Sequence, residues 1–295
     1  MKDVRMIPAR HFSNEESCGA FTVVELLVVI VTLALLAVLL LPALAASHTD
    51  SQTFQCLNNM KQLQLASMLY AGDNGDLLPG NEGHANPLST TSIIGVGPLD
   101  FDWVAGSFGT IGVGQNGAQD NPAGAGTNTA LLGVYGNNVP GLPAPLHGSI
   151  GGYTKNPVLY VCPTVHYIDP YYKKPRVRTC SVNCFVGTTP SEQLDHGSEI
   201  NYKYTVFRKY SDFVKLKSSD AFVFVEENIL SLNDGFLLVT EPGGGSDTPA
   251  ANHGQASSLS YADGHAELHE WHDYVLGKSG STDTQWLAAH VTVLK

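Results

Sequence analysis

Histidine and acidic side chains gather near the C-terminal end of the sequence. His253 precedes Asp263 and Gly264 in a His-x9-Asp-Gly pattern, and His265 follows directly. Imidazole and carboxylate groups are accepted as ligands by zinc and other transition ions. His253, Asp263 and His265 are therefore candidate ligands for a divalent metal.

The same segment also has a purely structural interpretation. The stretch 257–262 alternates as a β-strand does, Asp263-Gly264 suits a type I′ turn, and 265–271 reads as the returning strand. In this interpretation His253 hydrogen-bonds the backbone of the hairpin. We favour it over the metal site, and we expect no cofactor.

Cysteines are the second group of residues that could do chemistry. Of the five in the chain, Cys18 lies in the N-terminal segment, and the others are Cys56, Cys162, Cys180 and Cys184. An even number of cysteines in an exported domain favours disulfides. Three pairings are possible, and Cys180 with Cys184 plus Cys56 with Cys162 is preferred because it needs one long-range contact. A zinc site of four thiolates is the alternative.

Glu25 stands at the start of a long apolar block. The segment Leu26 to Ala46 carries no charged residue, and as a helix it would reach roughly 31 Å at about 1.5 Å per residue, enough to span a bilayer core. A carboxylate at the edge of such a segment usually has a function. Pro42 is expected to kink the helix or melt it locally.

The sequence of the remaining chain predicts a helix, long loops and a sheet. The stretch 53–70 lacks Gly and Pro and is expected to be an amphipathic helix. The stretch 77–152 is rich in Gly and Asn and is expected to form long loops with short strands or one short helix near 129–135. Besides the hairpin, strands are expected at 158–161, 176–186, 202–210 and 221–225.

The junction Ala20-Phe21-Thr22-Val23-Val24-Glu25 resembles the leader junction of type IV pilins and of type II secretion pseudopilins. The resemblance implies cleavage between Ala20 and Phe21 by a prepilin peptidase, N-methylation of Phe21, and pairing of Glu25 with the amino terminus of a neighbouring subunit. The His-x9-Asp-Gly pattern is similar to a signature of prepilin-type proteins in one large bacterial subgroup.

This resemblance implies an organisation for the whole chain. Residues 1–20 would be the leader, 21–71 a stalk helix with a membrane span at about 24–46, and 72–295 an exported globular domain. The expected fold class is α+β and pilin-like, with a long N-terminal helix, transmembrane and then amphipathic, packed on an antiparallel β-sheet with long Gly/Asn-rich loops. The expected localisation is the inner membrane in a single pass, with the N-terminus cytoplasmic and the C-terminal domain periplasmic or in an extracellular filament.

The function expected from the resemblance is that of a structural subunit and not an enzyme. Its partners would be the prepilin peptidase and methyltransferase, other pilin-like subunits, the secretion or pilus assembly machinery, and inner-membrane lipid. Nucleic acid is excluded because the formal net charge is −11 and phosphate binding needs clustered Lys and Arg.

Other interpretations of the sequence remain open. The segment Ala43-Leu44-Ala45 could be a signal peptidase I site, or the apolar block a plain anchor. A function of another class is a membrane-anchored, exported metal-dependent enzyme or carbohydrate-binding module, built around the acidic and histidine residues Glu226, Glu227, Asp234, His253 and Asp263.

Overall fold

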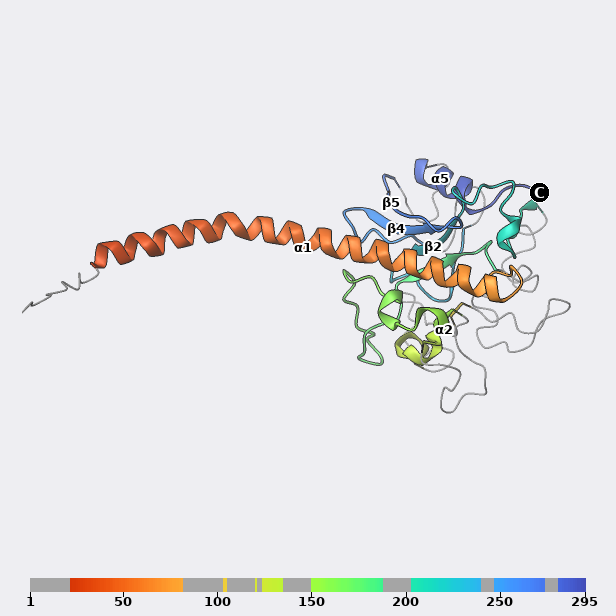
Figure 1. Ribbon diagram of the computed structural model, residues 1–295, viewed down its shortest axis with the longest axis horizontal. Helices are drawn as coiled ribbons and strands as arrows, with labels where there is room; N and C mark the ends of the chain where they lie inside the picture. The colour runs from red at the N-terminus through yellow and green to blue at the C-terminus, as the bar shows by residue number, and fades with distance from the viewer. Residues whose placement is uncertain are drawn as a thin grey trace, which may run out of the picture. The chain divides into compact units, whose positions relative to one another are not determined.

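The computed structural model describes residues 22–81, 103–104, 120, 124–134, 150–187, 203–239, 247–273 and 281–295, apart from the side chains of 37, 39–50 and 236. The chain divides into two compact units, Met1–Thr49 and Asp50–Lys295 (Figure 1). The predicted cleavage site, Ala20 and Phe21, lies outside the described residues.

Helix α1 (Val23–Asp73) has 51 residues and contributes to both units. In the first unit its large apolar side chains from Val23 to Val38 are between 42% and 78% exposed. Helical backbone continues through Pro42, and the predicted kink stays a prediction.

The prediction of a membrane span is wrong. Across the described residues, the structure contains no helix with both the length and the apolar character needed to cross a membrane. The predicted span at about 24–46 and the predicted single-pass inner-membrane localisation are both contradicted by this finding.

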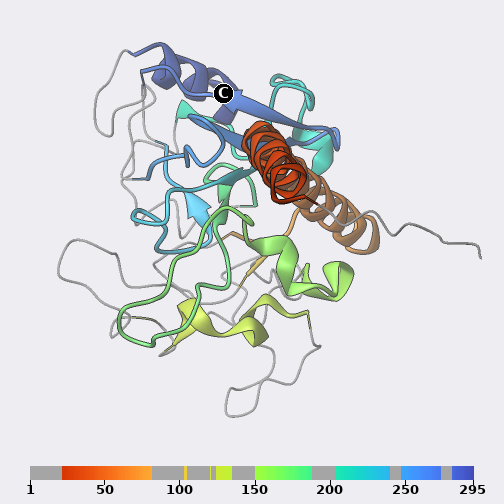
Figure 2. The ribbon, with the colours of Figure 1, turned by 90° about the vertical axis from the view of Figure 1, so that its left-hand side faces the viewer.

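In the second unit α1 contributes a buried stripe to the core. Its members recur every three or four residues, the spacing of one helix face: Cys56, Met60, Leu63, Ser67 and Tyr70. Residues 53–70, predicted as a helix, lie within α1. Around this part of α1, β4 and β5 lie on one side and α2 (Gly151–Thr154) on the other (Figures 1 and 2).

The sheet has five strands in the order β3-β1-β2-β4-β5. The strands are β1 (Cys180–Asn183), β2 (Phe222–Glu226), β3 (Phe236–Leu237), β4 (Ala256–Tyr261) and β5 (Ala266–Glu270). β1 pairs antiparallel with β2 and parallel with β3, while β2–β4 and β4–β5 are antiparallel. Because β1, β2 and β4 are buried along their whole length, the sheet forms the centre of the core.

The predicted fold class is therefore wrong as stated. It required a transmembrane segment, which the described helices do not provide, and a wholly antiparallel sheet, whereas the β1–β3 pair is parallel. The predicted Gly/Asn-rich loops lie largely outside the described residues.

The hairpin is present, but its turn differs from the prediction. The Gly264 N–H donates to the Tyr261 carbonyl at 2.9 Å, and the Tyr261 N–H donates to the His265 carbonyl at 2.9 Å. The loop is thus three residues long, from Ala262 to Gly264, and only Gly264 has a positive φ, of 97°. A type I′ turn would need two such residues, so this loop is of the three-residue kind that places Gly in the left-handed position.

Short helices account for several other differences. The segment predicted as a strand at 158–161 is the 3-10 helix η4 (Pro157–Tyr160), and the predicted strand at 202–210 forms only isolated bridges before η5 (Tyr210–Asp212). The short helix expected near 129–135 is η3 (Thr129–Leu132), preceded by η2 (Ala125–Thr127). Helix α5 (Thr282–Val291) was not expected from the sequence.

Candidate metal centre

Four side chains from four separate segments meet inside the second unit. Cys56 comes from α1, Cys162 follows η4, Glu226 ends β2, and His253 precedes β4. One donor atom from each residue lies within 4.8 Å of the other three. We call this group the Cys56–Cys162–Glu226–His253 cluster.

The position of Cys162 is fixed from both sides. Asn59, one turn along α1 from Cys56, donates from its amide nitrogen to the carbonyls of Val158 and Val161 at 3.5 and 3.3 Å. The Cys162 N–H donates to the Thr179 hydroxyl at 2.7 Å. These contacts hold the segment after η4 between the helix and the residues that lead into β1.

Glu226 and His253 are positioned by the strands of the sheet. The Ser258 N–H, in β4, donates to Oε2 of Glu226 at 2.7 Å. The N–H of His253 donates to the carbonyl of Ala256 at 3.1 Å, closing a tight turn in which Gly254 and Gln255 both have positive φ. The imidazole is held by α1 as well, because its Nδ1 lies 3.1 Å from the Thr53 hydroxyl.

The donor atoms of the cluster are in direct contact. Sγ of Cys56 lies 2.5 Å from Oε1 of Glu226, Nε2 of His253 lies 3.2 Å from Oε2 of Glu226, and Sγ of Cys162 lies 3.4 Å from the same Nε2. The side chains of His253 and Glu226 are 1% and 0% exposed, and both cysteines are buried.

The contacts set the charges of the cluster. Burial opposes a charged imidazole, yet the hydrogen bonds with Cys162 and Glu226 outweigh it and raise the pKa of His253 to about 10. The contact with Cys56 lowers the pKa of Cys162 to about 6, while the same contact, burial and the Glu226 charge raise the pKa of Cys56. Burial also opposes ionisation of Glu226, but His253 lowers its pKa. These contacts therefore favour the charged forms of Cys162, Glu226 and His253.

The four cysteines that follow Cys18 are free thiols in the structure: Cys56, Cys162, Cys180 and Cys184. Cys56 and Cys162, which were preferred as a disulfide pair, both belong to the cluster. The Sγ atoms of Cys180 and Cys184 instead donate to different carbonyls, those of Tyr160 and Val239, at 3.6 and 3.7 Å. The preferred disulfide pairing stays a prediction.

In the described part of the chain, the candidate metal ligands His253, Asp263 and His265 do not gather in one group. Nδ1 of His265 contacts Oδ1 of Asp263 at 2.6 Å, with side chains 41% and 37% exposed. His253 faces the buried cluster instead. The His253 N–H donates to the Ala256 carbonyl of the hairpin, while the imidazole contacts Thr53, Cys162 and Glu226.

Glu227, which was considered beside Glu226, lies in a different environment. Its carboxylate accepts hydrogen bonds from the hydroxyls of Ser181 and Ser231 at 2.5 and 2.9 Å. Burial, followed by the charge of Asp247, raises its pKa well above the usual range. Glu227 and Asp234, also buried, belong to the core and not to the cluster.

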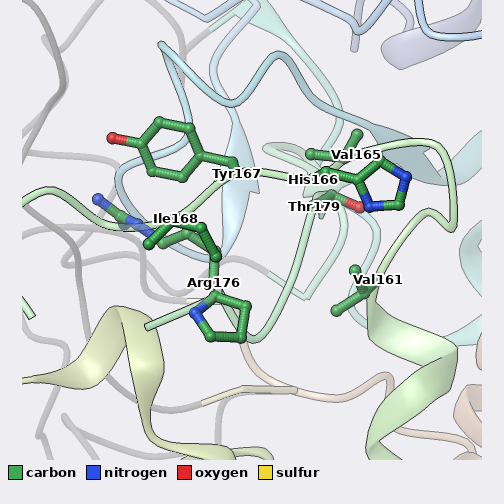
Figure 3. A pocket seen from close by; sticks show the side chains of 8 residues that line it. Val161, Val165, His166, Tyr167, Ile168, Arg176 and Thr179 are labelled. Atoms are coloured by element: carbon green, nitrogen blue, oxygen red, sulfur yellow. The ribbon is translucent and has the colours of Figure 1, made fainter. Parts of the chain in front are cut away.

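A small cavity of about 150 Å³ lies beside the Cys162 segment (Figure 3). Its lining comes mainly from the stretch between η4 and β1: Val161, Val165, His166, Tyr167, Ile168, Pro175, Arg176 and Thr179. The guanidinium of Arg176 forms a buried ion pair with Asp169 at 3.1 Å. The cavity is therefore bordered by a cation that already has an anionic partner.

The sequence led us to pair Cys56 with Cys162 as a disulfide and to place His253 with Glu226 in an alternative function, but not to join all four residues in one site. Glu226 was considered only for an enzyme or carbohydrate-binding module. The only signals were the residue types themselves, since the members in contact lie 27, 91 and 170 positions apart in the sequence. Comparison with protein-family models, with curated proteins and with solved structures found no match to this chain.

Proposed function

We propose that this chain is a prepilin-like structural subunit, a pseudopilin or minor pilin of a type II secretion or type IV pilus-like assembly. The observation that carries the proposal is the Phe21-to-Glu25 junction, which leads directly into the 51-residue helix α1. The partners would be a prepilin peptidase and methyltransferase, other pilin-like subunits and the assembly machinery.

The apolar side chains of α1 support polymerisation through this helix. From Val23 to Val38 the large apolar residues are exposed on every side of the helix, so a single contact face does not account for them. Fully burying a Val or Leu side chain is worth about 1.5–3 kcal/mol. Packing against equivalent helices of neighbouring subunits would bury many of them at once.

Glu25 supports the proposal through its charge. Hydrogen bonds from the N–H and the hydroxyl of Thr22, each 2.8 Å long, lower the pKa of the Glu25 carboxyl. The group therefore stays ionised at neutral pH and exposed. After cleavage, it would be available to pair with the methylated amino group of Phe21 in the adjacent subunit.

Maturation provides the decisive test. The full chain is co-expressed with a prepilin peptidase, and the intact mass is measured. We expect the loss of Met1 to Ala20 and the addition of one methyl group at Phe21. An Ala20→Leu variant serves as the control and should stay uncleaved, because the resemblance implies a small residue before the cut. A mature terminus at Ala46 would contradict the proposal and support ordinary secretion.

The second candidate function is an exported metal-dependent enzyme or carbohydrate-binding module. The cluster favours it only in part, because it joins Glu226 to His253 but leaves Asp263 on the hairpin loop. The buried side chains of Glu226 and His253 would not be reached by a substrate. We therefore rank this function below the structural subunit.

A further inference from the structure

We infer that Cys56, Cys162, Glu226 and His253 form a structural zinc site that joins α1 to the sheet. This inference does not depend on the prepilin proposal, since it concerns residues of the second unit alone. It differs from the candidate metal site considered on the hairpin, and it requires neither Asp263 nor His265.

The types of ligand select the metal. Zinc accepts thiolate, imidazole and carboxylate together, and four protein ligands are the usual number in its structural sites. Calcium and magnesium prefer sets of oxygen ligands, whereas this cluster offers two sulfur atoms, one nitrogen and one carboxylate. The mixed set therefore indicates zinc or a closely related transition ion.

The distances are compatible with a tetrahedral site. For zinc with Zn–S near 2.3 Å and Zn–N and Zn–O near 2.0 Å, the ligand atoms are separated by roughly 3.3 Å for N and O and roughly 3.5 Å for S and N. With Oε1 of Glu226 as the ligand oxygen, the corresponding distances are 3.3 Å between His253 Nε2 and Glu226 Oε1, and 3.4 Å between Cys162 Sγ and His253 Nε2. The Cys56–Glu226 pair, at 2.5 Å, would have to open by about 1 Å.

The surrounding hydrogen bonds also resemble those around a metal ligand set. A histidine ligand normally donates its second ring N–H to a neighbouring group, which fixes the tautomer. Here Thr53 contacts Nδ1 of His253, so Nε2 faces the other ligands. The Ser258 N–H orients Glu226, and the Thr164 hydroxyl lies 2.9 Å from Sγ of Cys162.

The site is closed, which points to a structural role. All four ligands come from the chain and are buried, and catalytic zinc sites instead keep one position for water or substrate. The ligands come from α1, the segment after η4, β2 and the turn before β4. One ion would thus fasten segments that are far apart in the sequence.

A Cys56–Cys162 disulfide is the competing state of the same atoms. Forming it would need an external two-electron oxidant such as dioxygen, which takes up the two electrons and two protons lost by the thiols, and it would remove both sulfur ligands from the site. The two states are therefore mutually exclusive, and one measurement of metal and thiols distinguishes them.

The test uses the full chain, purified under reducing conditions and dialysed against Zn²⁺ alone. We expect one tightly bound zinc per chain by mass spectrometry of the metal content. Replacing zinc by Co²⁺ should give the intense visible bands of tetrahedral cobalt together with thiolate-to-cobalt charge transfer. A separate sample isolated without reductant is digested for peptide mapping, in which no Cys56–Cys162 disulfide is expected.

Variants assign the ligands. Cys56→Ser, Cys162→Ser and His253→Asn should each lower zinc occupancy below about one tenth of that of the parent chain, because structural sites need all four ligands. Cys180→Ser is the matched control, since Cys180 is equally buried but lies outside the cluster. Thr53→Val keeps the side-chain shape and should weaken zinc affinity by about 10- to 100-fold through the imidazole it orients. His265→Ala should change nothing.

Three results would overturn the inference. These are a chain without zinc whose thiols stay reduced, a chain isolated with the Cys56–Cys162 disulfide, or zinc that is retained in the cysteine variants but lost in His265→Ala. A variant that fails to fold is replaced by Thr53→Val, whose affinity for Co²⁺ is read directly from the charge-transfer band. None of these results bears on whether the leader is cleaved, so the two proposals fail independently.

Discussion

Thr22 and Glu25 hydrogen-bond each other's backbone across the first turn of α1. The Thr22 N–H donates to the Glu25 carboxylate at 2.8 Å, and the Glu25 N–H donates to the Thr22 hydroxyl at 3.2 Å. This reciprocal arrangement is a capping box, which satisfies two backbone donors at a helix start. Glu25 thus has a structural reason to stand where it does, besides the assembly role that the resemblance implies.

Substitutions at these two positions separate the structural role from the assembly role. Thr22→Ala removes the cap, at about 1 kcal/mol of helix stability, but keeps the charge of Glu25. Glu25→Gln keeps a side-chain oxygen for the cap but loses the charge. We expect Glu25→Gln and Glu25→Ala to be cleaved normally and excluded from filaments, and Thr22→Ala to be incorporated, as measured by co-sedimentation with sheared filaments. If Glu25→Gln is incorporated while Thr22→Ala is not, Glu25 acts only as a cap.

Two adjacent glycines of α2 should respond oppositely to the same substitution. A Cβ at Gly151 would lie 2.1 Å from the Leu132 carbonyl oxygen, whereas one at Gly152 would meet nothing within 4 Å. Gly151→Ala would push the backbone of α2 away from that of Leu132, and it should lower the free energy of unfolding by at least about 1–3 kcal/mol. Gly152→Ala should be neutral or stabilise by up to about 1 kcal/mol, because alanine loses less backbone entropy in a helix. Urea unfolding measures both, and equal effects would contradict the close approach at Gly151.

The buried ion pair of Arg176 and Asp169 should behave as a coupled unit. Their side chains are 2% and 0% exposed, and Asp169 also accepts the N–H groups of Tyr171 and Tyr172 at 2.9 Å. Arg176→Met leaves a buried carboxylate and should cost about 3–5 kcal/mol. Asp169→Asn should lower the free energy of unfolding much less in the Arg176→Met variant than it does in the parent chain. Denaturant unfolding of the full double-mutant cycle checks this, and simple additivity would show that the pair contributes nothing.

His269 should make the stability of the chain depend on pH. Its ring stacks on Trp286 at 3.7 Å, and its Nε2 is buried without a hydrogen-bond partner in the described part of the chain. Burial lowers its pKa from 6.5, opposed by Asp283 and Glu267 and assisted by His290 and His272. The unfolded chain then takes up a proton that the folded chain resists, so stability present above about pH 6.5 is lost as the pH falls through the folded pKa.

His269→Phe retains an aromatic ring and removes this titration. Between about pH 8 and about pH 5, the parent chain should lose more free energy of unfolding than the variant does. Thermal unfolding at matched ionic strength measures the difference, in which the titration of every other group cancels. Parallel pH profiles for the two chains would exclude His269 as the cause.

The parts of the fold that the sequence predicted are those in which one local pattern dominates. Alternation at 257–262 and 265–271 predicted β4 and β5, and the run at 221–225 predicted β2. The segment 158–161 has a valine at each end but overlaps η4, because Pro157 begins that helix and the Asn156 side chain caps it by accepting from the Val158 N–H. For α5, the Ser281 hydroxyl cap on the Thr284 N–H was the signal that went unused.

The cluster could not be predicted because no local pattern links its members. The members were noted for their residue types, but the contacts that join them cross 27, 91 and 170 residues and depend on how α1 and the sheet pack together. The alternating pattern of the hairpin also led us to group His253 with Asp263. In the structure, the imidazole of His253 instead contacts Thr53 of α1.

The order of the strands has a consequence for how the chain behaves at high concentration. β5 is an outer strand, and its exposed residues Glu267, Leu268 and Glu270 include two carboxylates. The other outer strand, β3, is only two residues long. If β5 strands of two copies paired edge to edge, their acidic side chains would lie close together and repel each other. The net charge of −11 on each chain would add to this repulsion. The carboxylates of β5 therefore oppose aggregation through this longer edge of the sheet.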